Sequence, residues 1–164
     1  MLRQATAARS GAPLQRGFAI IFFLDTEFTG LSSEPHLLSI GLVADNGDRL
    51  YIELTNGWSE AECSLWVRDH VLPTLGNGER LTRRDAVNRI SSWLSSYDSS
   101  SLTILGETTW DTTLFSDLIR EFGVAPNCLR LKVVAFTGKE QASDFDLAKR
   151  RYLESHQMTA HHAL

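Results

Sequence analysis

An unbroken run of seven apolar residues, rich in Ile and Phe, covers positions 18–24 of the chain. The run is long enough for a β-strand and too short to span a membrane, and it predicts a central strand buried on both faces. Asp25 and Glu27 follow where this strand should end. Because side chains alternate along a strand, both carboxylates should project from one face, about 7 Å apart at Cα. Two like charges placed together favour a metal site, and an acidic turn is the alternative.

The pattern beyond this run predicts four more strands and four helices. Alternating residues around an Asp-Asn-Gly-Asp turn indicate an antiparallel hairpin, so the first three strands should form a meander. The expected strands cover 36–44, 49–54, 102–105 and 128–136, and the expected helices cover 59–72 and 141–154 and begin near 82 and 111. This order predicts an α/β fold, in which a mixed five-stranded sheet, with a meander followed by parallel strands, is flanked by helices.

Length and composition are those of a soluble globular protein. The chain has 164 residues, of which 43% are hydrophobic and 22% are charged, which fits one domain with a substantial core. The net charge of −4 supplies no general basic surface for nucleic acid. That charge disfavours a passive nucleic-acid binder, but it leaves open an enzyme that approaches a polyanion through bound metal ions. No segment predicts a membrane-spanning helix or a secretion signal.

The amino-terminal segment and the cysteines bear on location. Residues 1–17 contain three Arg and no acidic residue, which predicts a disordered extension, with an organellar transit peptide as the alternative. Cys63 and Cys128 lie far apart and have no metal-ligand spacing. Unpaired, reduced thiols are therefore expected, together with a cytoplasmic location.

Asp111 is a second candidate for metal binding. It precedes Leu114 by three residues and Phe115 by four, and these begin the apolar stripe of the following helix. At this spacing Asp111 should share the inward face, whereas Asp117 should lie on the solvated face. A helix N-cap is the alternative role for Asp111, and the sequence favours neither.

The third candidate is the histidine pair near the end of the sequence, at positions 161 and 162. Adjacent histidines near a terminus often have no specific role. An imidazole nevertheless titrates near neutral pH, and His161 could therefore accept a proton from water in a metal-dependent hydrolase.

Together these three segments resemble the motifs of the DEDD superfamily of 3′–5′ exonucleases, whose fold is ribonuclease H-like. Leu24-Asp-Thr-Glu-Phe-Thr-Gly-Leu31 resembles the first motif, with its Asp-x-Glu. Trp110-Asp-Thr-Thr-Leu-Phe115 resembles the second, and His161-His-Ala-Leu164 resembles the start of the third, His-x-Ala-Leu-x-Asp. The order and spacing of the motifs across residues 18–164 are similar to those of small bacterial exoribonucleases of the oligoribonuclease and RNase T type.

The resemblance implies an enzyme that releases nucleoside 5′-monophosphates from the 3′ ends of single-stranded nucleic acid, most of all RNA. Asp25, Glu27 and Asp111 would hold two Mg²⁺ or Mn²⁺ ions, and His161 would act as the general base. The residues implied to contact the terminal nucleotide are Phe28, Thr29, Gly30, Leu31 and Trp110. Ordinary core packing is the alternative for Phe28 and Trp110.

One part of the family pattern is missing. A fourth carboxylate would come two residues beyond Leu164, so we expect that the exonuclease domain, residues 18–164, is truncated before its last helix. A DNA exonuclease of the proofreading type is one alternative. A non-catalytic nucleic-acid-binding relic is another, if the fourth carboxylate is truly absent. A homodimer is expected by analogy alone.

Overall fold

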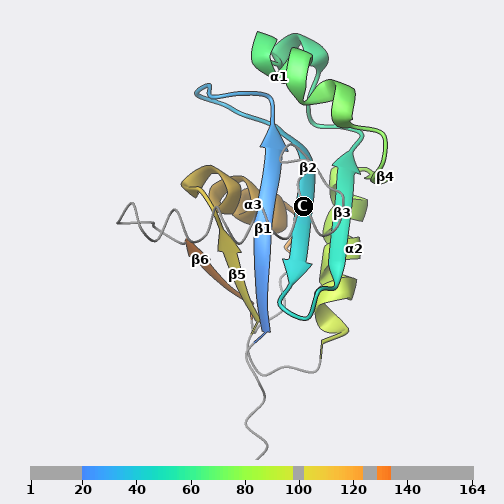
Figure 1. Ribbon diagram of the computed structural model, residues 1–164, viewed down its shortest axis with the longest axis vertical. Coiled ribbons are helices and arrows are strands. Elements are labelled where there is room, and N and C mark those ends of the chain that lie inside the picture. Colours follow the sequence, from blue (N-terminus) through green and yellow to red (C-terminus); the bar gives the residue numbers. More distant parts are fainter. Residues whose placement is uncertain (1–19, 98–101, 124–128, 134–164) are drawn as a thin grey trace, which may run out of the picture.

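The computed structural model of the protein describes residues 20–97 and 102–123 and the backbone of 129–133. Its central feature is a six-stranded mixed sheet in the order β4-β3-β2-β1-β5-β6 (Figure 1). The strands are β1 (Ile20–Phe28), β2 (Leu37–Ala44), β3 (Arg49–Leu54), β4 (Glu79–Leu81), β5 (Leu102–Gly106) and β6 (Leu129–Val133). The extension 1–17, the helix expected at 141–154 and His161 lie outside the described residues.

Strand directions confirm the predicted fold class. β1, β2 and β3 pair antiparallel as a meander, and β5 and β6 continue the sheet in parallel from β1. This arrangement, flanked by helices, is consistent with a ribonuclease H-like fold. The sheet has one strand more than predicted, because the three residues of β4 pair in parallel with the edge of β3. Three residues are too few for alternation to reveal a strand.

Two helices cover one face of the sheet. α2 (Arg83–Ser95) and α3 (Thr109–Phe122) both lie behind the sheet in the view of Figure 1. The apolar stripes predicted for them meet Phe22 and Leu24 of β1 in one core cluster. Phe22 has no exposed surface, and its ring meets the rings of Trp93 and Tyr97 edge-on, at centroid distances of 5.3 and 5.1 Å.

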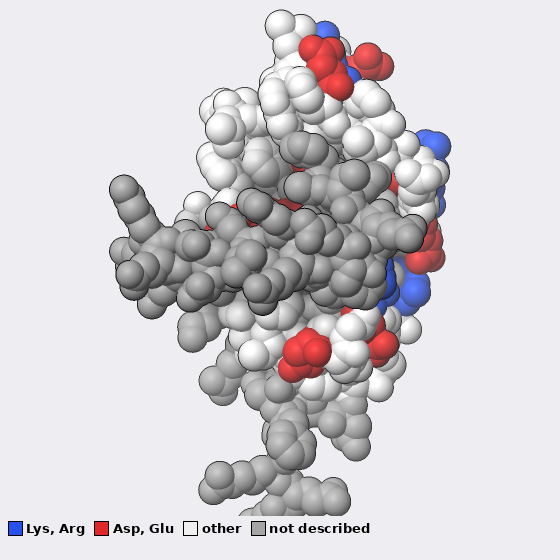
Figure 2. Space-filling model, viewed as in Figure 1, with Lys and Arg blue, Asp and Glu red and all other residues white. Residues whose placement is uncertain are grey.

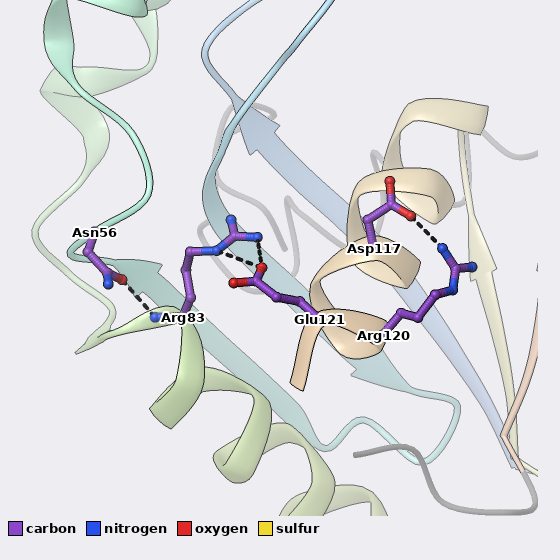
Figure 3. A network of polar contacts seen from close by, with 5 residues as sticks. All are labelled: Asn56, Arg83, Asp117, Arg120 and Glu121. Atoms are coloured by element: carbon purple, nitrogen blue, oxygen red, sulfur yellow. Dashed lines mark hydrogen bonds and ion pairs between the residues drawn. The ribbon is translucent and has the colours of Figure 1, made fainter. Parts of the chain in front are cut away.

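A polar network joins the ends of these helices (Figure 3). The backbone amide of Arg83 donates to Asn56 Oδ1 at 2.8 Å, which links the start of α2 to the loop after β3. The Arg83 guanidinium in turn pairs with the Glu121 carboxylate on α3. On the outer side of α3, Arg120 pairs with Asp117, which confirms that Asp117 faces solvent. Exposed pairs of this kind contribute little to stability, so the apolar contacts hold the helices in place.

The helix predicted at 59–72 is interrupted. Glu60–Glu62 forms a 3₁₀ turn, α1 covers Leu65–His70, and a second 3₁₀ turn covers Leu72–Thr74. A capping box is present at Ser59, whose N donates to Glu62 Oε2 at 2.7 Å, but it begins only the first 3₁₀ turn. Ser64 N donates to the carbonyl of Thr29 at 2.8 Å, and this long-range bond takes the place of a helical one. None of the described helices has the length and apolar character needed to cross a membrane.

The assignment of one face of β1 to the core can be tested with Phe22 and Phe23, two adjacent phenylalanines that point to opposite faces. Replacing Phe22 by Ala should lower the free energy of unfolding by about 3–5 kcal/mol, because it empties a fully buried site. The same change at Phe23, which is 37% exposed, should cost about 1 kcal/mol. Urea denaturation measures both. Similar losses at the two positions would contradict the assignment of the faces.

Candidate functional site

Asp25 and Glu27 lie within β1 rather than after it. The strand continues to Phe28 because β2 pairs with it along this length, whereas the pairing with β5 ends where Leu24 meets Gly106. Both carboxylate residues are half-buried and lie on the face opposite the α2–α3 core, as the alternation predicts. The pair therefore lies on the central strand, just beyond the end of its parallel neighbour. We call Asp25 and Glu27 the carboxylate pair.

A β-bulge follows the carboxylate pair directly. Glu27 is opposite Ser39 and Phe28 is opposite Leu37, so β2 contains one extra residue, Leu38. Leu37 joins the core under α2 and α3, while Leu38 joins a separate small cluster beneath α1. Bulges change the direction of side chains at the end of a strand and are common beside active sites. Here the extra residue lies in β2, and Phe28 keeps the α3-facing side of β1, where its ring meets that of Trp110.

Asp111 is 3% exposed and accepts four hydrogen bonds. Its Oδ1 accepts from Thr26 N at 3.0 Å and from Thr26 Oγ1 at 2.7 Å. Its Oδ2 accepts from Thr108 N at 2.9 Å and from Thr108 Oγ1 at 2.6 Å. Thr108 is the N-cap of α3, and Asp111 is the third residue of its capping box. Asp111 points inward, as predicted. The alternative role considered for it was the N-cap itself, but the N-cap is Thr108 and Asp111 is the third residue after it.

This bonding gives Asp111 a structural role, and its expected role as a metal ligand stays a prediction. Both of its oxygens accept hydrogen bonds from protein donors in the described structure. The hydrogen bonds reach β1 at Thr26, the residue between Asp25 and Glu27. Asp111 therefore holds the strand segment that carries the pair against the start of α3. We call these bonds between Asp111 and Thr26 the Asp111–Thr26 link.

The carboxylate pair has the donor chemistry of a divalent-cation site. Mg²⁺ prefers oxygen ligands and is often held by only one or two carboxylates together with water and substrate phosphates. Within the described ranges, no group of three or more His, Cys, Asp or Glu side chains is placed to hold a metal ion. The described part of the chain thus offers Asp25 and Glu27 as ligands. Two carboxylates fit a Mg²⁺ site whose other ligands are water and substrate phosphates.

The loop after β1 is held at both of its ends. Thr29 N donates to the His36 carbonyl at 2.9 Å, and His36 N donates to Thr29 Oγ1 at 3.0 Å. Gly30 has φ 134°, and a Cβ there would come within 3.0 Å of Ser64 Cβ. Only glycine fits both this backbone conformation and this contact. The loop therefore presents Leu31, which is 79% exposed, from a fixed base.

Two aromatic side chains meet where β1 ends, one residue after Glu27 in the sequence. The rings of Phe28 and Trp110 are 6.2 Å apart at a tilt of 34°, and they join the end of β1 to the first turn of α3. Trp110 is 37% exposed, and Phe28 is half-buried. Neither residue belongs to the main buried core. The exposure of Trp110 argues against its alternative role as an ordinary core residue.

The neighbouring strands add polar groups that the sequence had not singled out. Glu53 is 4% exposed and accepts hydrogen bonds from the amides of Gly76, Asn77 and Gly78 at 2.7–3.1 Å. Tyr51 precedes it on the same face. Burial raises the pKa of Tyr51 to about 12; the charges of Glu53 and Glu27 act in the same direction, and the nearby Ser39 hydroxyl opposes them. Sequence reasoning could have placed these residues near the pair only if the pairing register between β1, β2 and β3 had been known.

Comparisons with known proteins give partial similarity. No family model matches the chain. Two curated proteins named 3′–5′ exoribonuclease, from the CDC 1551 and H37Rv strains of Mycobacterium tuberculosis, are each 41% identical over 54 residues. The match spans 33% of this chain and 32% of each relative.

Among solved structures, the family B DNA polymerase of the archaeon Pyrobaculum calidifontis aligns with 67% of this chain and 12% of its own. The sequence identity is 12% and the TM-score is 0.39, which is too remote to support an argument about fold or function.

The Asp111–Thr26 link predicts a large stability effect. Replacing Asp111 by Ala should lower the free energy of unfolding by about 3 kcal/mol, because the buried amide and hydroxyl of Thr26 lose their acceptor and the cap of α3 at Thr108 is lost as well. The matched control is Asp117→Ala on the exposed face of the same helix, which should cost about 0.5 kcal/mol or less. Urea denaturation with a constant m-value compares the two. Equal losses would show that the link is not needed.

Proposed function

We propose that the protein is a metal-dependent 3′–5′ exonuclease that acts on single-stranded RNA. The observation that carries this proposal is the carboxylate pair, two acidic side chains on one face of the central strand, held in place by the Asp111–Thr26 link. The partial similarity to proteins named 3′–5′ exoribonuclease supports the reaction class and favours RNA over DNA.

Asp25 and Glu27 would hold Mg²⁺ or Mn²⁺ through their carboxylate oxygens. A cation held there would neutralise phosphate charge and lower the pKa of a bound water, the source of the nucleophile. In the hydrolysis, a water oxygen forms a bond to the terminal phosphorus and the bond to the preceding 3′ oxygen breaks. A proton passes to that leaving oxygen, and a nucleoside 5′-monophosphate is released. His161, outside the described residues, remains the predicted general base for the attacking water.

The residues that follow the pair at the end of β1, together with Trp110, suit a terminal nucleotide. Trp110 and Leu31 present apolar surface, and Phe28 lies against Trp110. A base that stacks on such side chains gains about 1–3 kcal/mol whatever its identity. Thr29 and Gly30 would keep the loop backbone close to the nucleotide without changing shape, since the loop is already fixed to His36 and Ser64. This arrangement favours a substrate whose end is unpaired.

The surface charge of the protein is consistent with recognition of the end of a nucleic-acid strand. In the described part of the face shown in Figure 2, acidic and basic side chains are interspersed and form no continuous basic surface. A protein that binds long nucleic acid through its backbone usually carries such a surface. We therefore expect that affinity comes from the metal site and the terminal nucleotide, with a weak dependence on salt.

The activity can be tested on the protein expressed from its complete gene. The substrates are 5′-labelled single-stranded RNA and DNA of equal sequence, each with Mn²⁺ or with a chelator. We expect stepwise shortening of the RNA from its 3′ end with Mn²⁺ only. Asp25→Asn and Glu27→Gln should each slow it by at least about a hundredfold, because a metal ligand is weakened at nearly constant shape.

The control is Asp117→Asn, an exposed carboxylate on α3, which should keep wild-type activity. Preferred shortening of DNA would favour the proofreading type of enzyme. Binding of RNA without shortening would favour a non-catalytic binder. Activity that survives the changes at both Asp25 and Glu27 would overturn the proposal.

A further inference from the structure

The Asp111 carboxylate accepts a full set of hydrogen bonds. A carboxylate has about four acceptor positions, divided between its two oxygens. In the described structure the amide and hydroxyl of Thr26 bond to Oδ1, and the amide and hydroxyl of Thr108 bond to Oδ2. Asp111 can therefore bind a cation directly only if one of these donors gives up its position.

The two amides are the less movable donors. The Thr26 amide belongs to strand β1, and the Thr108 amide closes the capping box at the start of α3. A hydroxyl, in contrast, can withdraw its proton by rotation about the bond between Cβ and Oγ, which leaves the backbone in place. The exchange should therefore involve the hydroxyl of Thr26, 2.7 Å from Oδ1, or that of Thr108, 2.6 Å from Oδ2.

Burial separates the two hydroxyls. Thr26 is 5% exposed, and within the described part of the chain its hydroxyl bonds to Asp111 alone, so its release would leave a buried donor without a partner. Thr108 is exposed, and water can replace Asp111 as the acceptor of its proton. The Thr108 oxygen can also go on accepting from Asp111 N, at 3.3 Å, which preserves the N-cap of α3. Release of the Thr108 hydroxyl is the less costly exchange.

We propose that the two oxygens of Asp111 have different roles: Oδ1 stays bound to Thr26, while Oδ2 exchanges the Thr108 hydroxyl for a divalent cation. This inference rests on the proposed function, because it takes Asp111 as a third metal ligand beside Asp25 and Glu27. Thr108 is then a positioning residue, whose hydroxyl holds Oδ2 in place and competes with the cation for it. The strength of this hydrogen bond limits how tightly the cation is held.

The test compares Thr108→Val with Thr26→Val, each of which removes one hydroxyl at nearly constant shape. Isothermal titration of the complete protein with Mn²⁺ should show affinity about fivefold to tenfold tighter in Thr108→Val, because the cation no longer competes with a hydrogen bond. Thr26→Val should bind Mn²⁺ no more tightly than wild type. The midpoint of thermal unfolding in chelator should fall by about 3–8 °C in both variants, because each loses a hydrogen bond to a buried carboxylate.

Two further variants separate the hydroxyl from the helix cap. Thr108→Gly also lacks the hydroxyl, and glycine is tolerated at an N-cap, so it should show the same gain in Mn²⁺ affinity. Thr108→Ser keeps the hydroxyl and should keep the wild-type affinity.

The affinities distinguish this exchange from a purely structural role. If both hydroxyls only stabilise the fold, the unfolding midpoint falls and Mn²⁺ affinity rises in none of the variants, which would overturn this inference and leave the proposed function intact. Tighter binding in Thr26→Val would place the exchange at Oδ1 and would also contradict it. Failure of the wild-type protein itself to bind Mn²⁺ would overturn both the inference and the proposed function.

Discussion

The Asp111–Thr26 link is the interaction on which the arrangement of the site depends. A buried carboxylate is tolerated only when donors surround it, and Asp111 has four, two from Thr26 and two from Thr108. The link fixes the first turn of α3 to β1 beyond the end of β5, where no parallel strand supports β1. Because Thr26 lies between Asp25 and Glu27, one set of hydrogen bonds on the core face sets the position of both carboxylates on the other face.

The opposite side of the site depends on β2 and β3. Glu53 is surrounded by the amides of the loop before β4, so this carboxylate is fixed and cannot serve as a metal ligand without losing those bonds. Ser39 lies between this fixed group and Glu27 in the register of the sheet. The carboxylate pair is thus held on the side of α3 by hydrogen bonds, and the side towards β3 ends at a second carboxylate whose oxygens are already engaged.

Local pattern was sufficient for most of the fold and for the first part of the site. Alternation placed Asp25 and Glu27 on one face, and helical spacing placed Asp111 inward, because both follow from the geometry of a single element. It did not show which partner a buried carboxylate would find, since Thr26 is 85 positions away. The break at Ser64, strand β4 and the neighbours of Glu27 likewise depend on contacts between distant segments. His161 stays a prediction, because it lies outside the described residues.

The most direct measurement is a crystal structure of the complete protein with Mn²⁺, in which anomalous scattering locates the ion. The account predicts an anomalous peak bound by Asp25 and Glu27, with the hydrogen bonds from Thr26 to Asp111 retained. An ion bound elsewhere, or no ion at the pair at saturating Mn²⁺, would contradict it.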